Sequence, residues 1–497
     1  MKTISHWIGG RTYEGSAERH GEVSDPATGE ITGQVEFATR PVVDEAVAAA
    51  SDAFATWRNV SLSRRTQILF RFRELVDAYT DDLVRIVTAE HGKVGEDARG
   101  EVTRGKEVVE FACGIPHLLK GAHSENISTK VDSYSIRQPI GVAAGITPFN
   151  FPVMVPMWMH PVAIACGNTF VLKPSERDPS ASNFVAALWA EAGLPDGVFN
   201  VVHGDKDAVD AILAHPGIAA VSFVGSTPIA RYVYENGTRA GKRVQALGGA
   251  KNHAMVLPDA DMELAADALT SAAYGSAGER CMAISAVVAV GAAGDVLVEE
   301  LRRRAEAIVV GPGHDESCQM GPLVTEQHRD RVAGYVDAGV EAGAELIVDG
   351  RDIKVEGYEN GFFLGPCLFD QVTTEMSIYK DEIFGPVLIV VRADTFDEGL
   401  DIVNRNPYGN GTAIFTNDGG AARMFQNEVN VGMVGVNVPI PVPMAYYSFG
   451  GWKGSLFGDL HVHGAEGVQF YTRGKVMTTR WPDPHHRGVD LGFPTSS

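Results

Sequence analysis

Gly141-Val142-Ala143-Ala144-Gly145-Ile146 is an apolar run of strand length, and it opens the series of segments that determines the fold class. Further apolar runs follow at residues 169–172, 199–202, 220–224 and 253–257. The stretches between them, such as 181–192 and 205–214, are compatible with helices. Strands that alternate with helices are typical of a parallel sheet covered by helices, so residues from about 140 to 260 predict an α/β domain.

A second alternating region follows, with strands predicted at 285–290, 388–391 and 411–415 and helices at 294–308 and 326–342. Residues 133–137 and 469–477 also have strand-like patterns, and we expect them to form a small β arm that reaches a neighbouring subunit. The 497 residues are enough for two or three domains. We therefore predict an α/β fold in three parts: a parallel-sheet domain at 1–124 and 140–252, a second α/β domain at 253–440, and an oligomerisation arm from 125–139 and 468–497.

The bulk composition argues against several classes of partner. A formal net charge of -21 and a pI near 5.1 disfavour nucleic acid, which needs a concentrated positive surface. No apolar stretch of about 18 residues is present, and no apolar run follows a basic start, so neither a membrane span nor an export signal is predicted. We expect a soluble, cytoplasmic protein.

The five cysteines, at positions 113, 166, 281, 318 and 367, are odd in number and widely spaced. This spacing predicts reduced thiols and no metal site. Cys281 alone lies beside charged residues, in Gly278-Glu279-Arg280-Cys281-Met282. A neighbouring cation favours the thiolate, which is the nucleophilic form. On these five residues alone, a reactive cysteine and a buried structural cysteine at a helix start are equally well supported.

Two loops follow predicted strands, where ligands of parallel sheets bind. In the first loop, Asn150 lies between Pro148 and Pro152, and its amide is placed to stabilise an oxyanion; a turn asparagine bonded to its own backbone is the alternative. In the second, Lys173 and Glu176 suit the ribose of a dinucleotide, although a solvated ion pair also explains them.

A third segment, Phe223-Val224-Gly225-Ser226-Thr227, opens a predicted helix whose free N–H groups suit a pyrophosphate. The G-x-G-x-x-G fingerprint is absent, so the generic dinucleotide-binding dehydrogenases are not supported.

Taken together, these segments resemble the aldehyde dehydrogenase superfamily over residues 20 to about 475. The resemblance extends to Glu382-Ile383-Phe384-Gly385-Pro386-Val387, Asn406-Pro407-Tyr408-Gly409 and Phe449-Gly450-Gly451-Trp452-Lys453-Gly454-Ser455. It implies that Cys281 is the nucleophile, and that Asn150 and the backbone N–H of Cys281 form the oxyanion hole.

The same resemblance implies an NAD site. Lys173 and Glu176 would hold the adenine ribose, and Glu176 would exclude the 2′-phosphate of NADP. Glu382 would contact the nicotinamide ribose, with Phe384 near the ring. The further residues assigned to this site are Phe149, Arg177, Ser226 and Gly248.

One departure from the family pattern narrows the reaction. Hydrolytic members carry Glu-Leu-Gly-Gly-Lys, whereas this chain has Ala246 at the glutamate position and no acidic residue between Glu235 and Asp259. Loss of a general base slows the activation of water by a factor of about 10² to 10⁴. A thiol acceptor needs less help, so coenzyme A is the expected acyl acceptor.

This combination resembles the CoA-acylating branch that oxidises methylmalonate or malonate semialdehyde and releases carbon dioxide or bicarbonate. Its substrates keep a carboxylate, which a guanidinium binds well. Arg280 is one candidate, although it could instead activate the thiolate. Arg104 is the second, although an ion pair with Glu101 or Glu107 explains it nearly as well. His253 is expected to be a core histidine without a catalytic role.

A homotetramer, assembled as a dimer of dimers, is also expected, with a dimer as the alternative. A hydrolytic aldehyde dehydrogenase and a catalytically silent NAD-binding relative are the two alternative interpretations.

Overall fold

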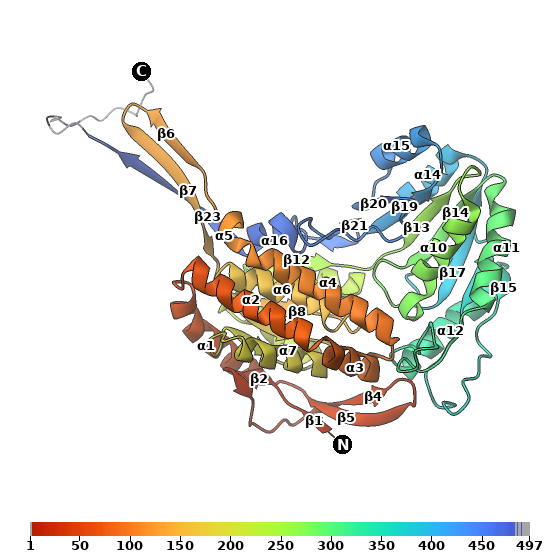
Figure 1. Ribbon diagram of the computed structural model, residues 1–497, viewed down its shortest axis with the longest axis horizontal. Helices are drawn as coiled ribbons and strands as arrows, with labels where there is room; N and C mark the ends of the chain where they lie inside the picture. The colour runs from red at the N-terminus through yellow and green to blue at the C-terminus, as the bar shows by residue number, and fades with distance from the viewer. Residues whose placement is uncertain (1, 483–484, 486–488, 490–497) are drawn as a thin grey trace.

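The computed structural model describes residues 2–482, 485 and 489, and Figure 1 shows two α/β bodies from which a narrow arm projects. Each body is built on its own sheet, one of eight strands and one of seven. Both sheets are largely parallel and are covered by helices, so the predicted fold class is confirmed.

The first sheet has the order β22-β12-β11-β8-β9-β10-β2-β3, with a parallel centre and antiparallel edges. Its strands are β2 (Trp7–Ile8), β3 (Arg11–Thr12), β8 (Val142–Ile146), β9 (Thr169–Lys173), β10 (Phe199–Val201), β11 (Ile218–Val224), β12 (Arg243–Leu247) and β22 (Leu456–Phe457). The predicted strands near 142, 169, 199 and 220 are confirmed. Strand β12 was not predicted, because Arg243 and Gln245 interrupt its apolar pattern.

Alternate residues of a central strand face two separate cores. Phe170 and Leu172 of β9 pack into one apolar cluster, and Val171 between them packs into another. Burial on both faces explains the continuous apolar run of this strand. The first cluster takes residues from α2 (Leu62–Ala78), α3 (Thr80–His91), α4 (Gly95–Cys113), α5 (Ile115–Leu118), α6 (Met154–Ala165) and α7 (Ser180–Glu191), and the second mainly from α1 (Arg40–Trp57), α8 (Lys206–Ala214) and α9 (Thr227–Arg239).

The second sheet has the order β15-β16-β17-β14-β13-β19-β20, and only β15 is antiparallel to its neighbour. Its strands are β13 (Asn252–Val256), β14 (Ile284–Val290), β15 (Glu345–Val348), β16 (Cys367–Asp370), β17 (Val387–Ala393), β19 (Gly411–Phe415) and β20 (Met433–Val436). The sequence grouped the run at 253–257 with the first sheet. That grouping is wrong, because β13 pairs with β14 and β19.

Helices cover both faces of this second sheet. One face carries α10 (Met262–Tyr274), α11 (Ala293–Glu306), α12 (Glu326–Glu341) and α13 (Ser377–Lys380), and the other α14 (Phe396–Arg405) and α15 (Gly419–Glu428). The helices predicted at 294–308 and 326–342 correspond to α11 and α12 and are confirmed.

The arm is a three-stranded antiparallel sheet in the order β23-β7-β6, made of β6 (His123–Ser128), β7 (Val131–Pro139) and β23 (Thr472–Arg480). Figure 1 shows it extending away from the body that contains β8. The strand predicted to begin at residue 469 begins instead at Thr472, because α16 (Gly464–Phe470) occupies the preceding residues. Most of the predicted arm segment after residue 482 lies outside the described residues.

Smaller elements complete the fold: the sheet β1-β5-β4, formed by β1 (Lys2–Ile4), β4 (His20–Asp25) and β5 (Glu30–Glu36), and the pair β18 (Tyr408–Gly409) and β21 (Trp452–Lys453). Among the residues that the structure describes, no helix has the length and apolar character needed to cross a bilayer.

Candidate active site

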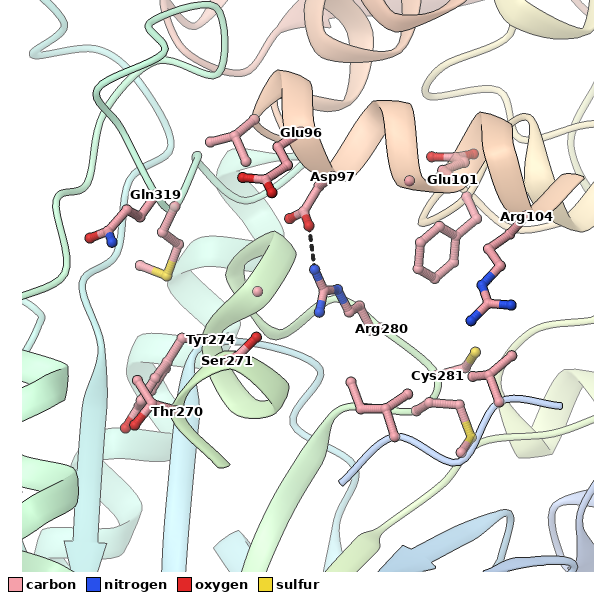
Figure 2. Close-up of a pocket in the computed structure, with 18 of the residues that line it drawn as sticks. Glu96, Asp97, Glu101, Arg104, Thr270, Ser271, Tyr274, Arg280, Cys281 and Gln319 are labelled. Carbon is pink, nitrogen blue, oxygen red and sulfur yellow. Dashed lines mark hydrogen bonds and ion pairs between the residues drawn. The ribbon is translucent and has the colours of Figure 1, made fainter. Parts of the chain in front are cut away.

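A cavity of about 990 Å³ holds Cys281 and both candidate arginines. Helix α4 forms one wall and the turn that carries Cys281 lies opposite it, as Figure 2 shows. Arg104 and Arg280 point into this space from opposite sides. Further lining residues are Glu96, Asp97, Glu101, Phe151, Trp158, Thr270, Ser271, Tyr274, Met282, Gln319, Ile440 and Phe449.

Cys281 lies in a turn between a short 3₁₀ helix, η1 (Gly275–Gly278), and strand β14. It is therefore not at a helix start, and that prediction is corrected. The side-chain amides of Asn252 and Asn410 donate to its carbonyl oxygen at 2.9 and 3.0 Å. Two buried donors on one carbonyl fix the backbone of the turn and hold the sulfur in one place.

The electrostatic surroundings of Cys281 differ from those that its sequence neighbours suggest. Burial raises the pKa of its thiol to about 12, the carboxylate of Glu382 adds to this effect, and Arg280 is the weakest of the opposing influences. The guanidinium of Arg280 points toward Asp97 instead, with which it forms an ion pair. Arg280 therefore lowers the pKa of the Cys281 thiol only slightly in the free protein, and its role as thiolate activator or substrate clamp stays a prediction.

This raised pKa predicts an unusual pH dependence of alkylation. The thiol stays protonated at neutral pH, and only the thiolate reacts, so the rate of labelling of Cys281 by iodoacetamide should rise about tenfold per pH unit from pH 7 to 10 without levelling off. Mass spectrometry of the Cys281 peptide measures this rate, with the peptide containing Cys318 as an internal comparison. A plateau below pH 9 would show a lowered pKa and contradict the prediction.

The pose of Arg280 is built by two neighbours. Asp97 accepts from Arg280 through Oδ1 and from the backbone N–H of Ser276 through Oδ2, at 2.8 Å. Gly275 leaves the space that the guanidinium occupies, since a Cβ there would lie 2.4 Å from Nη1 of Arg280. Any side chain at position 275 would displace the guanidinium, so Arg280 enters the cavity in a defined orientation.

Arg104 is oriented less strongly. Its Nη1 lies 2.9 Å from Glu107 and 3.4 Å from the sulfur of Met444. The ion pair predicted as the alternative to a substrate role is therefore present, and the side chain nevertheless lines the cavity. The two interpretations of Arg104 are compatible, because one carboxylate leaves several guanidinium donors free.

Asn150 lies in the loop after β8 and is 3% exposed. Lys93 donates to its backbone carbonyl oxygen at 2.6 Å. The neighbouring Phe149 meets Phe384 edge to face, with ring centroids 5.9 Å apart, so the structure brings these two candidate cofactor residues together. Phe384 also lines a small adjoining cavity with Cys281 and Glu382.

Glu382 is held in a tight cradle. Its Oε1 accepts from the backbone N–H of Ala250 at 2.9 Å, and a Cβ at Gly249 would lie 2.2 Å from Oε2. Burial raises the pKa of Glu382 to about 7. Lys251 stabilises the chain just before Glu382, since its Nζ donates to the carbonyl oxygens of Ile378 and Asp381 at 2.6 and 2.9 Å.

Ser226 and Gly248 lie around Thr227, close to this cradle. Ser226 is the N-cap of α9, and its side chain makes no capping bond, so the first N–H groups of the helix are available to an anion. The hydroxyl of Thr227 accepts from the N–H of Gly249 at 2.8 Å, and the N–H of Gly248 donates to the carbonyl oxygen of Ser455 at 3.0 Å.

Lys173, Glu176 and Arg177 form a separate group at the end of β9. Nζ of Lys173 lies 3.2 Å from Oε2 of Glu176, and Nε of Arg177 lies 3.9 Å from Oε1. Burial acts to raise the pKa of Glu176, but Lys173 and the other partners outweigh it, and the net effect lowers the pKa. A charged carboxylate accepts from ribose hydroxyls, so the group fits a dinucleotide ribose. None of the three lines the cavities at Cys281.

The position at which hydrolytic relatives carry a glutamate has apolar surroundings in the structure. Ala246 is 0% exposed and packs in the cluster that includes Phe223 and Val244. His253 is buried, and its Nε2 lies 3.2 Å from the hydroxyl of Tyr379, so the prediction of a satisfied core histidine is confirmed.

Two charged residues on or near α4, Lys93 and Asp97, were not identified from the sequence, and Glu101 was considered only as a partner of Arg104. Asp97 and Glu101 line the cavity together with Arg104. Asp97, Glu101 and Arg104 are spaced four and three residues apart, and this spacing places their side chains on one face of α4. This spacing was visible in the sequence, but nothing there indicated that the face turns toward Cys281.

Comparison with known proteins supports the geometry. The model of the aldehyde dehydrogenase family matches residues 13–477. A malonate-semialdehyde dehydrogenase of Pseudomonas aeruginosa is 55% identical over 497 residues, which is 100% of both chains. Malonate-semialdehyde dehydrogenase 2 of Geobacillus kaustophilus is 51% identical and covers 97% of this chain and 99% of its own.

Two solved structures are also similar. The first, from Sinorhizobium meliloti, was assigned as a methylmalonate-semialdehyde dehydrogenase and contains NAD; it has a TM-score of 0.96 and 53% identity, covering 98% of this chain and 99% of its own. The second, a methylmalonate-semialdehyde dehydrogenase of Oceanimonas doudoroffii, has a TM-score of 0.96 and 55% identity, covering 97% and 99%.

Proposed function

Because the chain belongs to the aldehyde dehydrogenase family, we propose that it oxidises malonate and methylmalonate semialdehyde with NAD and passes the acyl group to coenzyme A. The observation that carries this proposal is the cavity in which the thiol of Cys281 and the guanidinium groups of Arg104 and Arg280 face the same space. A small aldehyde that bears a carboxylate matches both features, since the thiol attacks the carbonyl and the guanidinium groups bind the carboxylate.

The proposed reaction begins at the sulfur of Cys281. The thiol loses its proton to solvent, and the resulting thiolate attacks the aldehyde to form a hemithioacetal, whose oxyanion accepts from the amide of Asn150 and the backbone N–H of Cys281. When bound, NAD supplies the hydride acceptor. Loss of the hydride leaves a thioester on Cys281. The residues proposed to hold NAD are Phe149, Lys173, Glu176, Arg177, Ser226, Gly248, Glu382 and Phe384.

The carboxylate then leaves as carbon dioxide, and the electron pair of the broken bond passes to the α-carbon, which takes up a proton. The thiolate of coenzyme A attacks the thioester carbonyl and displaces Cys281. The products are acetyl-CoA or propionyl-CoA. The apolar surroundings of Ala246 support a thiol acceptor, because water would need a base that this position does not provide.

This proposal predicts that turnover requires coenzyme A. Malonate semialdehyde and NAD alone should give a burst of one NADH per chain, after which the rate should fall at least about 10²-fold below the rate with coenzyme A, because hydrolysis of the thioester lacks a base. Stopped-flow absorbance at the NADH band measures both phases, and mass spectrometry identifies acetyl-CoA.

Sustained turnover to a free acid without coenzyme A would support the hydrolytic alternative. The candidate base that would then activate water is Glu382, whose carboxylate influences the pKa of Cys281 and whose own pKa is raised to about 7. Glu382→Gln would abolish the hydrolysis in that case. Failure of both reactions, with NAD still bound, would favour the catalytically silent relative.

We also propose that the chain forms a homotetramer assembled through the arm. We further propose that it resides in a reducing compartment such as the cytoplasm. The arm supports this assembly because it exposes apolar side chains, with Val476 69%, Trp481 59% and Tyr134 39% exposed. The five free cysteines support a reducing compartment.

The proposed domains are an NAD-binding domain at 1–124 and 140–252, a catalytic domain at 253–440 and the arm at 125–139 and 468–497. The two separate sheets support the first two parts. The proposed boundaries leave out β22, which extends the first sheet.

A further inference from the structure

Lys93 and Glu101 form an ion pair that is fully enclosed by the protein. Nζ of Lys93 lies 2.8 Å from Oε2 of Glu101, and both side chains are 0% exposed. Transfer of two charges out of water is unfavourable, and a buried pair persists only where further hydrogen bonds satisfy it. Those further bonds show what the pair does in this fold.

Both partners bond to the same short loop. The ammonium of Lys93 donates to the carbonyl oxygen of Asn150 at 2.6 Å and lies 4.3 Å from the ring centroid of Phe151. The other oxygen of Glu101, Oε1, accepts from the backbone N–H groups of Val153 and Met154 at 2.7 and 3.2 Å. The pair thus contacts the loop at its middle and at its end.

The bonds to Val153 and Met154 satisfy the start of a helix. Helix α6 begins at Met154, and its N-cap residue Val153 has no side chain that can accept from the first N–H groups. The carboxylate of Glu101 accepts from these groups in place of a cap, and its negative charge is favourable at a helix N-terminus. The loop is therefore tied to α4 at the point where α6 begins.

The contact at Asn150 has a different consequence. Asn150 stands between Pro148 and Pro152, and a single bond from Lys93 holds its backbone carbonyl. The direction of the peptide group sets the direction of the side chain, so movement of this carbonyl would reorient the Asn150 amide. A displacement of about 1 Å at a reacting group lowers a rate by a factor of about 10².

We infer that Lys93 and Glu101 are positioning residues, whose ion pair holds the loop in the conformation that directs the Asn150 amide to the oxyanion formed at Cys281. This inference rests on the role proposed for Asn150. Both residues bond to the backbone of the loop. They act through the backbone of the loop, which distinguishes them from the catalytic residues.

The test is a double-mutant cycle on the full-length protein, read as the rate of the first NADH burst. Asn150→Ala should lower the burst rate about 10²-fold, through loss of one oxyanion donor. Lys93→Met should lower it about 20-fold, with the KM for the semialdehyde changed less than about threefold. The double variant should be no slower than Asn150→Ala, because residues that act through one group are not additive.

Two further variants separate positioning from stability. Lys93→Met/Glu101→Leu replaces the ion pair by apolar side chains, a change that folded proteins often tolerate. This variant takes the place of Lys93→Met in the cycle if Lys93→Met alone does not fold. Its Tm should fall, because leucine leaves the N–H groups of Val153 and Met154 without their acceptor, and its burst rate should stay low. Lys242→Met is the matched control, since Lys242 is also buried and donates to two carbonyl oxygens, those of His215 and Ile218. It should lower the Tm and leave the burst rate unchanged.

The outcomes are distinguishable. If Asn150→Ala slows the burst and Lys93→Met does not, or if the two losses multiply in the double variant, the inference is overturned and the role of Asn150 stands. If Asn150→Ala has no effect, the proposed oxyanion hole fails, and the inference falls with it. Loss of burst rate in Lys242→Met equal to that in Lys93→Met would show a general effect of stability and would also overturn it.

Discussion

Cys281→Ala is expected to lower the formation of NADH from malonate semialdehyde by at least about 10⁴-fold, with or without coenzyme A. The sulfur forms the only covalent bond between this protein and the substrate in the proposed reaction, and alanine cannot replace it. The burst phase should vanish together with the steady state, because acylation precedes both. Stopped-flow absorbance and mass spectrometry of the acyl-enzyme measure these losses.

The fold should survive this change, since Cys281 lies in a turn that two asparagine side chains hold through its backbone carbonyl. Cys113→Ala is the matched control, because Cys113 is a buried cysteine on α4 outside the cavity. It should retain the activity of the natural chain. Residual activity of Cys281→Ala above a hundredth of the natural rate would contradict a thioester on this residue.

The double variant Arg104→Gln/Arg280→Gln should lower kcat/KM for malonate semialdehyde about 10³-fold. Removal of the charged partners of a desolvated carboxylate costs about 2 to 5 kcal/mol. Propanal has no carboxylate, so its kcat/KM should fall less than about fivefold. The ratio of the two constants, measured under identical conditions, is the decisive quantity. Arg280→Lys alone should reduce this ratio to a smaller extent, because lysine keeps the charge and loses the paired donors.

Arg99→Gln is the control variant, because it removes a positive charge from α4 outside the cavity. Arg99 lies on the same helix, pairs with Asp81 and does not line the cavity. Its substitution should leave kcat/KM for both malonate semialdehyde and propanal unchanged. Equal losses with malonate semialdehyde and propanal in the double variant would show that the arginines shape the cavity and do not bind the carboxylate.

The parallel strands of the first sheet could be predicted because their signal is local. The run around Val142 and the run around Val171 are apolar throughout, as burial on both faces requires. Strand β12 lacked this signal, since Gln245 is polar yet buried, and its side chain donates to the carbonyl oxygens of Leu460 and His461. Those partners are more than 200 residues away, so no local pattern could reveal them.

The residues of the candidate site likewise divide into those with a local sequence signal and those that only the structure identifies. Cys281 and Asn150 stand in short motifs whose residue types suit their chemistry, and both were identified from the sequence. Asp97 was missed, although it sets the pose of Arg280, because their contact spans 183 residues. The small effect of Arg280 on the pKa of the Cys281 thiol could not be predicted from their adjacency in the sequence, since the direction of the arginine side chain depends on this distant carboxylate.

The sequence by itself determined the α/β class, the family and the residue types that can perform the chemistry. These properties depend on strand periodicity and on short motifs, and both are local along the chain. Only the tertiary structure decided which charges meet at Cys281, what fixes the Asn150 loop and how Glu382 is enclosed. Charge and desolvation act through space, so the pKa of a thiol or carboxylate follows from the groups packed around it, and folding assembles these groups from distant parts of the chain.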